Sequence, residues 1–315
     1  MEINNEEPPQ SFFSTKIIFI LFGVASLLGW NALLTELDFF NVFVPSMNPF
    51  VSFSFLNFIL NIGFLFLLVW KKDLFPLKLQ LIGGIVGSIV FLIIMPAFTM
   101  ILSYDSFMNR FVTGLLVLLM GFINAICSGG FFNLVSFFPL EMIVSLSTGQ
   151  GFSGIAMNVL QYFVLVSIPY DGPTDPKIMT EKQKEDQRRI YSIRGWVFFS
   201  ISSLILIICL IILLIYYNTE YFQYYLRNSQ NQGNKDDPSK LLKEETEPEK
   251  KNNEELINPE NKELSFKELF FKLKDLNLLI AYIYIVTFAL FPGASINQNL
   301  FGLSSDYNSN TIILI

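Results

Sequence analysis

The sequence predicts an all-α polytopic membrane protein, and two observations carry this prediction. Of the 315 residues, 52% are hydrophobic, and the mean hydropathy is +0.48. Apolar runs of about 20 residues recur along the chain, and each is long enough to cross a hydrocarbon core roughly 30 Å thick. Such runs must be helices, because a helix satisfies its own backbone hydrogen bonds in lipid, and the alternating pattern of a membrane β-barrel is absent.

The apolar runs predict seven membrane-spanning helices. Residues 1–15 form a polar, acidic tail, which differs from the basic start of a cleaved signal peptide, so the first span should be retained. The predicted spans cover residues 16–37, 50–70, 79–102, 111–138, 147–168, 196–217 and 276–296. Residues 311–315 resemble the start of an eighth helix, from which we expect the sequence to be truncated or its gene model to end early.

Two hydrophilic segments interrupt the later spans. Residues 169–195 mix charges of both signs with several prolines, which predicts a loop. Residues 218–275 are acidic and rich in Glu, Lys and Asn, so we expect a largely disordered loop that ends in an amphipathic segment at residues 264–275.

The positive-inside rule favours a cytoplasmic N-terminus, and with it a cytoplasmic 218–275 loop. The lysines that carry this prediction flank the first three spans: Lys16, Lys71, Lys72 and Lys78. Six lysines and arginines in residues 169–195, on the opposite side, argue the other way, but they lie partly away from the span ends. We expect the plasma membrane as the location, with an intracellular membrane as the alternative.

Composition excludes several other classes of protein. The net charge of −6 argues against a nucleic-acid partner. Cys127 and Cys209 both lie inside apolar runs, so no disulfide framework is predicted. Because the chain has no histidine, it lacks the commonest metal ligand and general base. We therefore expect no metal, no cofactor and no enzymatic activity.

The middle of the chain, residues 109–166, combines small residues with uncharged amides at membrane depth. Gln150, Gly154, Met157 and Gln161 are spaced by four, three and four residues, so one helical face carries both glutamines. Such a face is typical of a helix that lines a polar path. It is equally typical of a packing helix whose amides are satisfied by neighbours.

Neutral polar residues also recur in the other apolar runs, and no Lys or Arg lies in the interior of a complete predicted span. The polar residues are Asn31, Ser54, Asn57, Asn61, Asn124, Asn133, Gln150, Asn158 and Gln161. Any single amide is explained by a bridge between helices. The whole set favours a hydrated path, and the missing cations favour a neutral polar solute over an anion.

Two further residues have two interpretations each. Trp30, in the first span, is either an interfacial anchor or an aromatic surface on which a ring stacks. Pro292, late in the seventh span, bends its helix for packing or for a gate.

Several motifs resemble those of the equilibrative nucleoside transporter family, in the same order along the chain. Gly29-Trp30-Asn31 is similar to the Pro-Trp-Asn of the family's first helix, with Gly in place of Pro. The stretch from Gly129 through Pro139 to Thr148-Gly149-Gln150-Gly151-Phe152-Ser153-Gly154 resembles its fourth-to-fifth helix region, where Ser-Gly-Gln-Gly-Leu-Ala-Gly is typical. Residues 220–225 resemble the aromatic end of its sixth helix, and Phe291-Pro292 resembles the Phe-Pro of its seventh.

The resemblance implies eleven helices in a major-facilitator-like arrangement of six plus five. Residues 16–217 would then form the six-helix N-terminal half, and residues 276–315 would form helix 7 and the start of helix 8. The implied function is facilitated passage of nucleosides, or of nucleobases, by alternating access around a midplane site. The implied partners are that substrate and the lipid bilayer.

The resemblance also assigns roles to individual residues. Trp30 would pack against the substrate, Gln150 would hydrogen-bond the base edge, and Asn31 would orient Trp30 or bond the solute. The second helix would contact the substrate near Asn57, Phe58 or Asn61. Packing or gating positions would be Gly129, Pro139, Gly149, Gly151, Gly154 and Pro292. The family's Asp-Trp-x-Gly-Arg motif, in its eighth helix, would follow Ile315.

Two alternatives to a nucleoside transporter remain at this point. Seven complete spans are also the number in a seven-span receptor, although the chain has no extracellular disulfide to match. The neutral polar residues would equally suit a transporter of another small neutral polar solute.

Overall fold

The computed structural model describes residues 12–71, 75–170, 172–173 and 179–235. The chain divides into two compact units, Met1–Ser229 and Gln230–Ile315. The described residues of the second unit are the last six of one helix. The predicted seventh span, Pro292, the start of an eighth helix and most of the 218–275 loop therefore lie outside the described residues.

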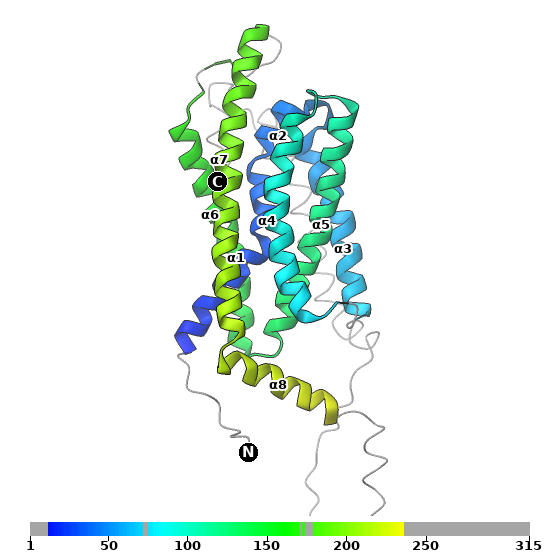
Figure 1. Cartoon of the computed structure of the whole chain (residues 1–315), viewed down its shortest axis with the longest axis vertical. Helices are drawn as coiled ribbons and strands as arrows, with labels where there is room; N and C mark the ends of the chain where they lie inside the picture. Colours follow the sequence, from blue (N-terminus) through cyan, green and yellow to red (C-terminus); the bar gives the residue numbers. More distant parts are fainter. Residues whose placement is uncertain (1–11, 72–74, 171, 174–178, 236–315) are drawn as a thin grey trace, which may run out of the picture. The chain divides into compact units, whose positions relative to one another are not determined.

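Helices make up most of the described part of the chain, and Figure 1 shows α1 and then α3 to α7 alternating in direction from one to the next. The elements are α1 (Phe12–Thr35), α2 (Leu37–Phe43), the 3-10 turn η1 (Pro45–Met47), α3 (Pro49–Trp70), α4 (Leu77–Ile101), α5 (Phe107–Val135), α6 (Leu140–Ser167), α7 (Glu181–Tyr217) and α8 (Glu220–Lys235). The all-helical prediction is confirmed for these residues, which contain no strand.

Five of the described helices are long and apolar enough to cross a membrane: α1, α3, α4, α5 and α7. They match five of the predicted spans. The predicted span at residues 147–168 lies within α6, whose 28 residues would reach about 42 Å as a helix. Serines, glycines and amides lower the hydropathy of α6, so its place as a span stays a prediction.

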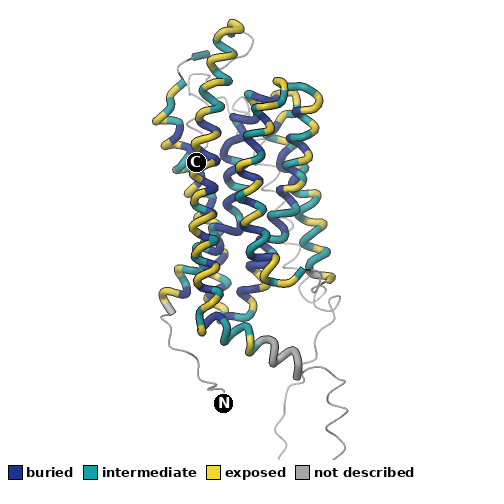
Figure 2. The backbone as a smooth tube through the Cα atoms, in the orientation of Figure 1, coloured by how far each residue is buried: buried dark blue, intermediate teal, exposed yellow. Residues whose placement is uncertain are grey.

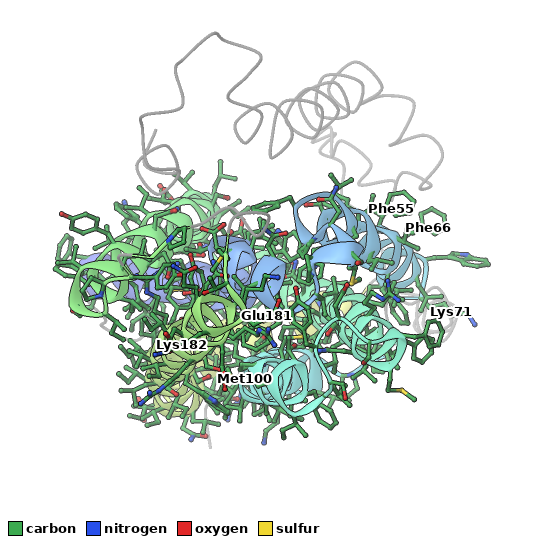
Figure 3. All side chains as sticks on the ribbon, turned by 90° about the horizontal axis from the view of Figure 1, so that it is seen from above. Phe55, Phe66, Lys71, Met100, Glu181 and Lys182 are labelled. Carbon is green, nitrogen blue, oxygen red and sulfur yellow. The ribbon has the colours of Figure 1, made fainter. Side chains whose placement is uncertain are left out.

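The outward faces of these helices carry large apolar side chains. On α3, Phe55 is 66% exposed and Phe66 is 60% exposed, and Figure 3 shows both pointing away from the neighbouring helices. Figure 2 shows the buried residues on the faces turned toward other helices. An apolar exterior of this kind is suited to lipid contact, because lipid tails are as apolar as these side chains.

At the end of the bundle where α7 meets α8, aromatic rings from three helices and from the α5–α6 turn pack together. Phe19 of α1 lies 4.9 Å from Phe138, and Phe138 lies 5.7 Å from Phe222 of α8, measured between ring centroids. Tyr216 of α7 lies 5.4 Å from Phe222. The first turns of α8 are therefore held against α1, α7 and the α5–α6 turn by edge-to-face and tilted aromatic contacts.

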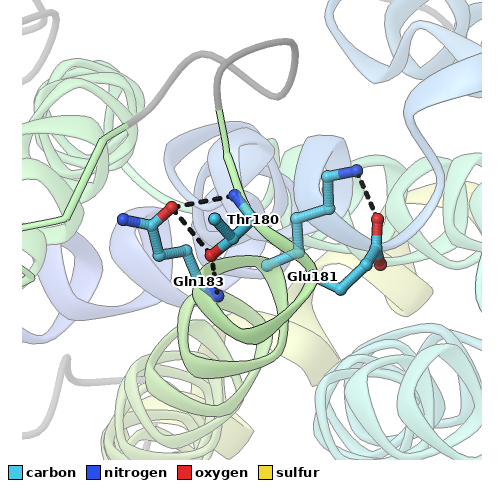
Figure 4. Close-up of polar contacts among 4 residues, drawn as sticks. Thr180, Glu181 and Gln183 are labelled. Carbon is cyan, nitrogen blue, oxygen red and sulfur yellow. Dashed lines mark hydrogen bonds and ion pairs between the residues drawn. The ribbon is translucent and has the colours of Figure 1, made fainter.

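The start of α7 corrects one sequence prediction. Residues 169–195 were predicted as a loop, but α7 begins at Glu181, fifteen residues before the predicted span. The physical reason is a capping box: the Thr180 side chain accepts from the Gln183 backbone, and the Gln183 side chain accepts from the Thr180 backbone N at 2.8 Å (Figure 4). Lys184 and Glu181 add an ion pair at 2.8 Å in the first turn.

Replacing Thr180 by alanine should loosen the start of α7. The change removes one half of the capping box and should cost about 1 kcal/mol of local helix stability. Hydrogen exchange at the backbone amides of residues 181–185 should therefore accelerate about fivefold. Thr180→Ser keeps the hydroxyl and should exchange like the parent. Equal exchange in all three proteins would show that the capping box does not hold this end.

Candidate functional site

The closest contact between two described helices joins the middle of α1 to the first half of α6. A Cβ atom on Gly149 would lie 2.0 Å from the Ile20 carbonyl oxygen, and one on Gly23 would lie 2.0 Å from the Leu146 carbonyl oxygen. Neither position can hold a side chain without separating the helices. The two glycines therefore bring the backbones of α1 and α6 into contact, as small residues do between membrane helices.

About one helical turn from Gly23 along α1, a cluster of polar side chains joins α1, α5 and α6. Ser26 of α1 donates its hydroxyl hydrogen to the Gly23 carbonyl at 2.8 Å. Gln150 of α6 donates from Nε2 to Ser26 Oγ at 3.1 Å, and Ser128 of α5 donates to the Ser26 carbonyl at 3.4 Å. Gln150, the predicted base-binding residue, is thus placed against α1 while its side chain stays half-buried.

A second polar contact between α1 and α6 lies further along α1. Asn31 donates from Nδ2 to the buried Ser153 hydroxyl, and a Cβ on Gly154 would lie 3.9 Å from the same Nδ2. The neighbouring Trp30 is half-buried and packs against the apolar core. Of the predicted substrate-binding residues, Trp30, Asn31 and Gln150 therefore lie along the contact between α1 and α6.

The three candidates from the second span lie on α3, which packs against α5. Asn57 is 2% exposed, and Gly121 of α5 approaches so closely that a Cβ there would be 2.3 Å from the Asn57 carbonyl oxygen. Asn61 donates from Nδ2 to the Gly121 carbonyl at 3.4 Å. Phe58 is half-buried on the same helix. Within the described residues, the Nδ2 atom of Asn57 is buried without a hydrogen-bond partner.

The remaining packing or gating candidates have different surroundings. A Cβ on Gly129 would lie 3.1 Å from Leu68 of α3, and Pro139 precedes the first residue of α6. Around Gly151, no atom of the described part of the chain lies within 4 Å of the Cβ position. Pro292 lies outside the described residues.

A buried group of charged residues lies at the opposite end of α1 from α8. Arg194 of α7 is 4% exposed and donates from Nε to the Ile168 carbonyl at 2.7 Å, while Glu36 is 2% exposed. The guanidinium interacts electrostatically with Glu36 and with the half-buried Asp38, but no described residue forms an ion pair with it. Gln161 of α6 interacts with Glu36, and the Oε1 atoms of both side chains are buried without a hydrogen-bond partner among the described residues.

Sequence reasoning missed the importance of Arg194, because residues 169–195 were predicted as a loop. The signal that could have found it is the sequence Thr180-Glu181-Lys182-Gln183, a capping box that predicts a helix start well before Arg194. Two carboxyl groups around one guanidinium also leave an unequal charge count in a buried place.

A sequence model of the family described as "Nucleoside transporter" matches residues 115–315, which is more than half of the chain. The chain belongs to the nucleoside transporter family. The resemblance predicted from the motifs is confirmed, and the alternative of a seven-span receptor is set aside. As a member of this family, the chain is a multi-pass integral membrane protein.

Two curated relatives of this nucleoside transporter family member come from Arabidopsis thaliana. Equilibrative nucleotide transporter 1 is 24% identical over 170 residues, which make up 52% of this chain and 37% of the relative. Equilibrative nucleotide transporter 4 is 22% identical over 155 residues, which make up 48% of this chain and 37% of the relative. The matched part of the chain thus spans little more than a third of the length of either relative.

Alanine at Gly149 should separate α1 from α6. A Cβ 2.0 Å from a carbonyl oxygen must move one backbone, so we expect a loss of about 1–3 kcal/mol in stability, read as a lower melting temperature in detergent. Gly151→Ala is the matched control, two residues away with open space at its Cβ position, and should be neutral or slightly stabilising. Equal melting temperatures for the two variants would contradict the close contact.

Replacing Arg194 by methionine should destabilise the buried charged group that it forms with Glu36 and Asp38. The change leaves Glu36 and Asp38 without a cation, which should cost about 3 kcal/mol. Adding Glu36→Gln to this variant removes one of the two carboxyl groups and should recover part of the melting temperature. The exposed Arg189→Met is the control, expected within about 0.5 kcal/mol of the parent. No recovery in the double variant would mean that the burial of the Glu36 carboxyl does not depend on Arg194.

Proposed function

We propose that this protein carries nucleosides or nucleobases across the membrane by facilitated diffusion, with alternating access to a site beside the contact between α1 and α6. The observation that carries the proposal is the pair of uncharged polar contacts there, Gln150 to Ser26 and Asn31 to Ser153. Both amides are half-buried within long helices, and Gln150 lies in the part of the chain that the family model matches. Neutral hydrogen-bonding groups suit a neutral polar solute.

In this proposal, the residues along α1 and α6 bind the substrate. Trp30 offers an aromatic face to the base, Gln150 hydrogen-bonds the base edge, and Asn31 orients Trp30 or bonds the solute. Asn57, Phe58 and Asn61 of α3 supply the contact from the second span. Gly149 and Gly154 allow α6 to stay close to α1, while Gly129, Gly151, Pro139 and Pro292 act in packing or gating.

We further propose a major-facilitator-like architecture in which residues 16–217 are the six-helix half, with helix 7 and the start of helix 8 in residues 276–315. The N-terminus, the tail of residues 1–15 and the 218–275 loop then lie on the cytoplasmic side of the plasma membrane. The alternating directions of α1 and α3 to α7 support this order (Figure 1). A half-bundle of this kind needs a second half to alternate access across the site.

The charges in the described helices favour nucleosides over nucleotides as substrates. The names of both relatives refer to nucleotides, whose phosphates would require a cation. Among the described residues, Arg194 is the only buried lysine or arginine, and Glu36 and Asp38 already surround it. This balance favours the uncharged nucleoside.

The proposal is tested by uptake into liposomes that contain the full-length gene product. Labelled uridine and adenosine should enter in a saturable manner, and the corresponding nucleotides should not. Gln150→Leu should lower nucleoside uptake about tenfold or more, because an unpaired polar edge of the base is then buried. Asn133→Leu replaces an exposed amide of α5 and is the matched control.

Two results would contradict the proposal. Saturable uptake of nucleotides in preference to nucleosides would favour an anionic substrate. Absence of any nucleoside uptake by correctly folded protein would favour another small neutral polar solute.

A further inference from the structure

We propose that Ser26 is a positioning residue that fixes the amide of Gln150 in one orientation, so that its acceptor Oε1 and the second N–H of its Nε2 are offered to the substrate in a fixed order. The inference rests on the proposed function and adds a rule for selectivity among nucleosides. It depends on how hydrogens are shared among Gly23, Ser26 and Gln150.

The Ser26 hydroxyl has a single hydrogen, which is used within α1. Ser26 is 2% exposed in the middle of α1, and its Oγ donates to the Gly23 carbonyl at 2.8 Å. A serine hydroxyl has one hydrogen to donate and lone pairs to accept with. Because the hydrogen is used within α1, the side of the oxygen that faces α6 can only accept.

This acceptor on Ser26 fixes the orientation of the Gln150 amide. Nε2 of Gln150 lies 3.1 Å from Ser26 Oγ and is the donor that this acceptor requires. Turning the amide over would place Oε1 against an oxygen whose hydrogen is used elsewhere, or would break the bond from Ser26 to Gly23. Oxygen and nitrogen of an amide are told apart by the hydrogen bonds that they make, and here the neighbours decide the assignment.

Some hydrogen-bonding atoms of Gln150 remain available to a ligand. The Gly23 and Gly149 contact holds the backbone of α6 against α1, so Gln150 cannot move away from Ser26 as a rigid unit. Its side chain is half-buried, and within the described residues Oε1 forms no hydrogen bond. Gln150 can therefore present Oε1, which binds an N–H of the base, and the second hydrogen of Nε2, which binds an acceptor, each from a fixed side of the amide.

The fixed orientation of the Gln150 amide distinguishes bases whose hydrogen-bond donors and acceptors are exchanged. Uridine and inosine carry an N–H in the ring and an exocyclic oxygen, whereas cytidine and adenosine carry a ring nitrogen acceptor and an exocyclic amine. For one pose of the base, an amide of fixed orientation matches one of these two patterns and sets acceptor against acceptor and donor against donor in the other. An amide that is free to turn over can match both patterns.

The test compares uptake of uridine with cytidine, and of inosine with adenosine, by the full-length gene product in liposomes. In the parent, kcat/KM should differ by about fivefold or more within at least one pair, the effect of one mismatched hydrogen bond. In Ser26→Ala the ratio should fall toward one, while uptake of the better substrate is retained. Ser26→Thr keeps the hydroxyl and should keep the parent ratio.

The controls separate this inference from the proposed function. Ser26→Cys, of nearly the same volume but a weak donor and acceptor, should lose the ratio as Ser26→Ala does, and it replaces that variant if alanine prevents folding. A parent ratio of one in both pairs, or an unchanged ratio in Ser26→Ala, would overturn the inference while nucleoside transport stands. Absence of nucleoside uptake by the parent would overturn the proposed function and this inference with it.

Discussion

The contact between Gly23 and Gly149 is the constraint on which the candidate site depends. It brings two helix backbones together so closely that neither residue can carry a side chain. Because the helices cannot separate there, polar side chains on either side of the contact are held within hydrogen-bonding distance: Ser26 with Gln150, and Asn31 with Ser153. In lipid, where the hydrophobic effect does not hold helices together, close packing of this kind supplies much of the attraction.

The sequence predicted much of this arrangement, because apolar length, small residues and amides are local signals. It placed the five long apolar helices α1, α3, α4, α5 and α7, though not the start of α7 or the helices α2 and α8, and it singled out the Gly149 region. It could not show that Asn57 and Asn61 of α3 pack against Gly121 of α5, because the pairing of helices depends on contacts between distant segments. It also did not show which partner Gln150 would find, since Ser26 lies 124 residues away and has no unusual sequence around it.

Arg194 shows why charge alone is a poor guide to a loop. Its segment contains several ionised residues, yet the capping box starts a helix that carries the guanidinium into a buried place next to Glu36 and Asp38. Exposed neighbours in the same segment, such as Glu181 and Lys182 (Figure 3), retain their contact with water and cost little. The same local composition thus yields both a solvated helix start and a buried charged group where the start of α2, α6 and α7 meet.

The polarity of α6 has a consequence for how the protein is made. α1 leaves the ribosome before α3, α4 and α5, and its glycine and serine face then lacks the partner that covers it. α6 has less apolar surface than these earlier helices, so it gains less from entering lipid alone and more from docking on α1. We therefore expect α1 to remain without this partner until α6 has been made, and a side chain at Gly23 that blocks the contact to reduce the yield of inserted protein.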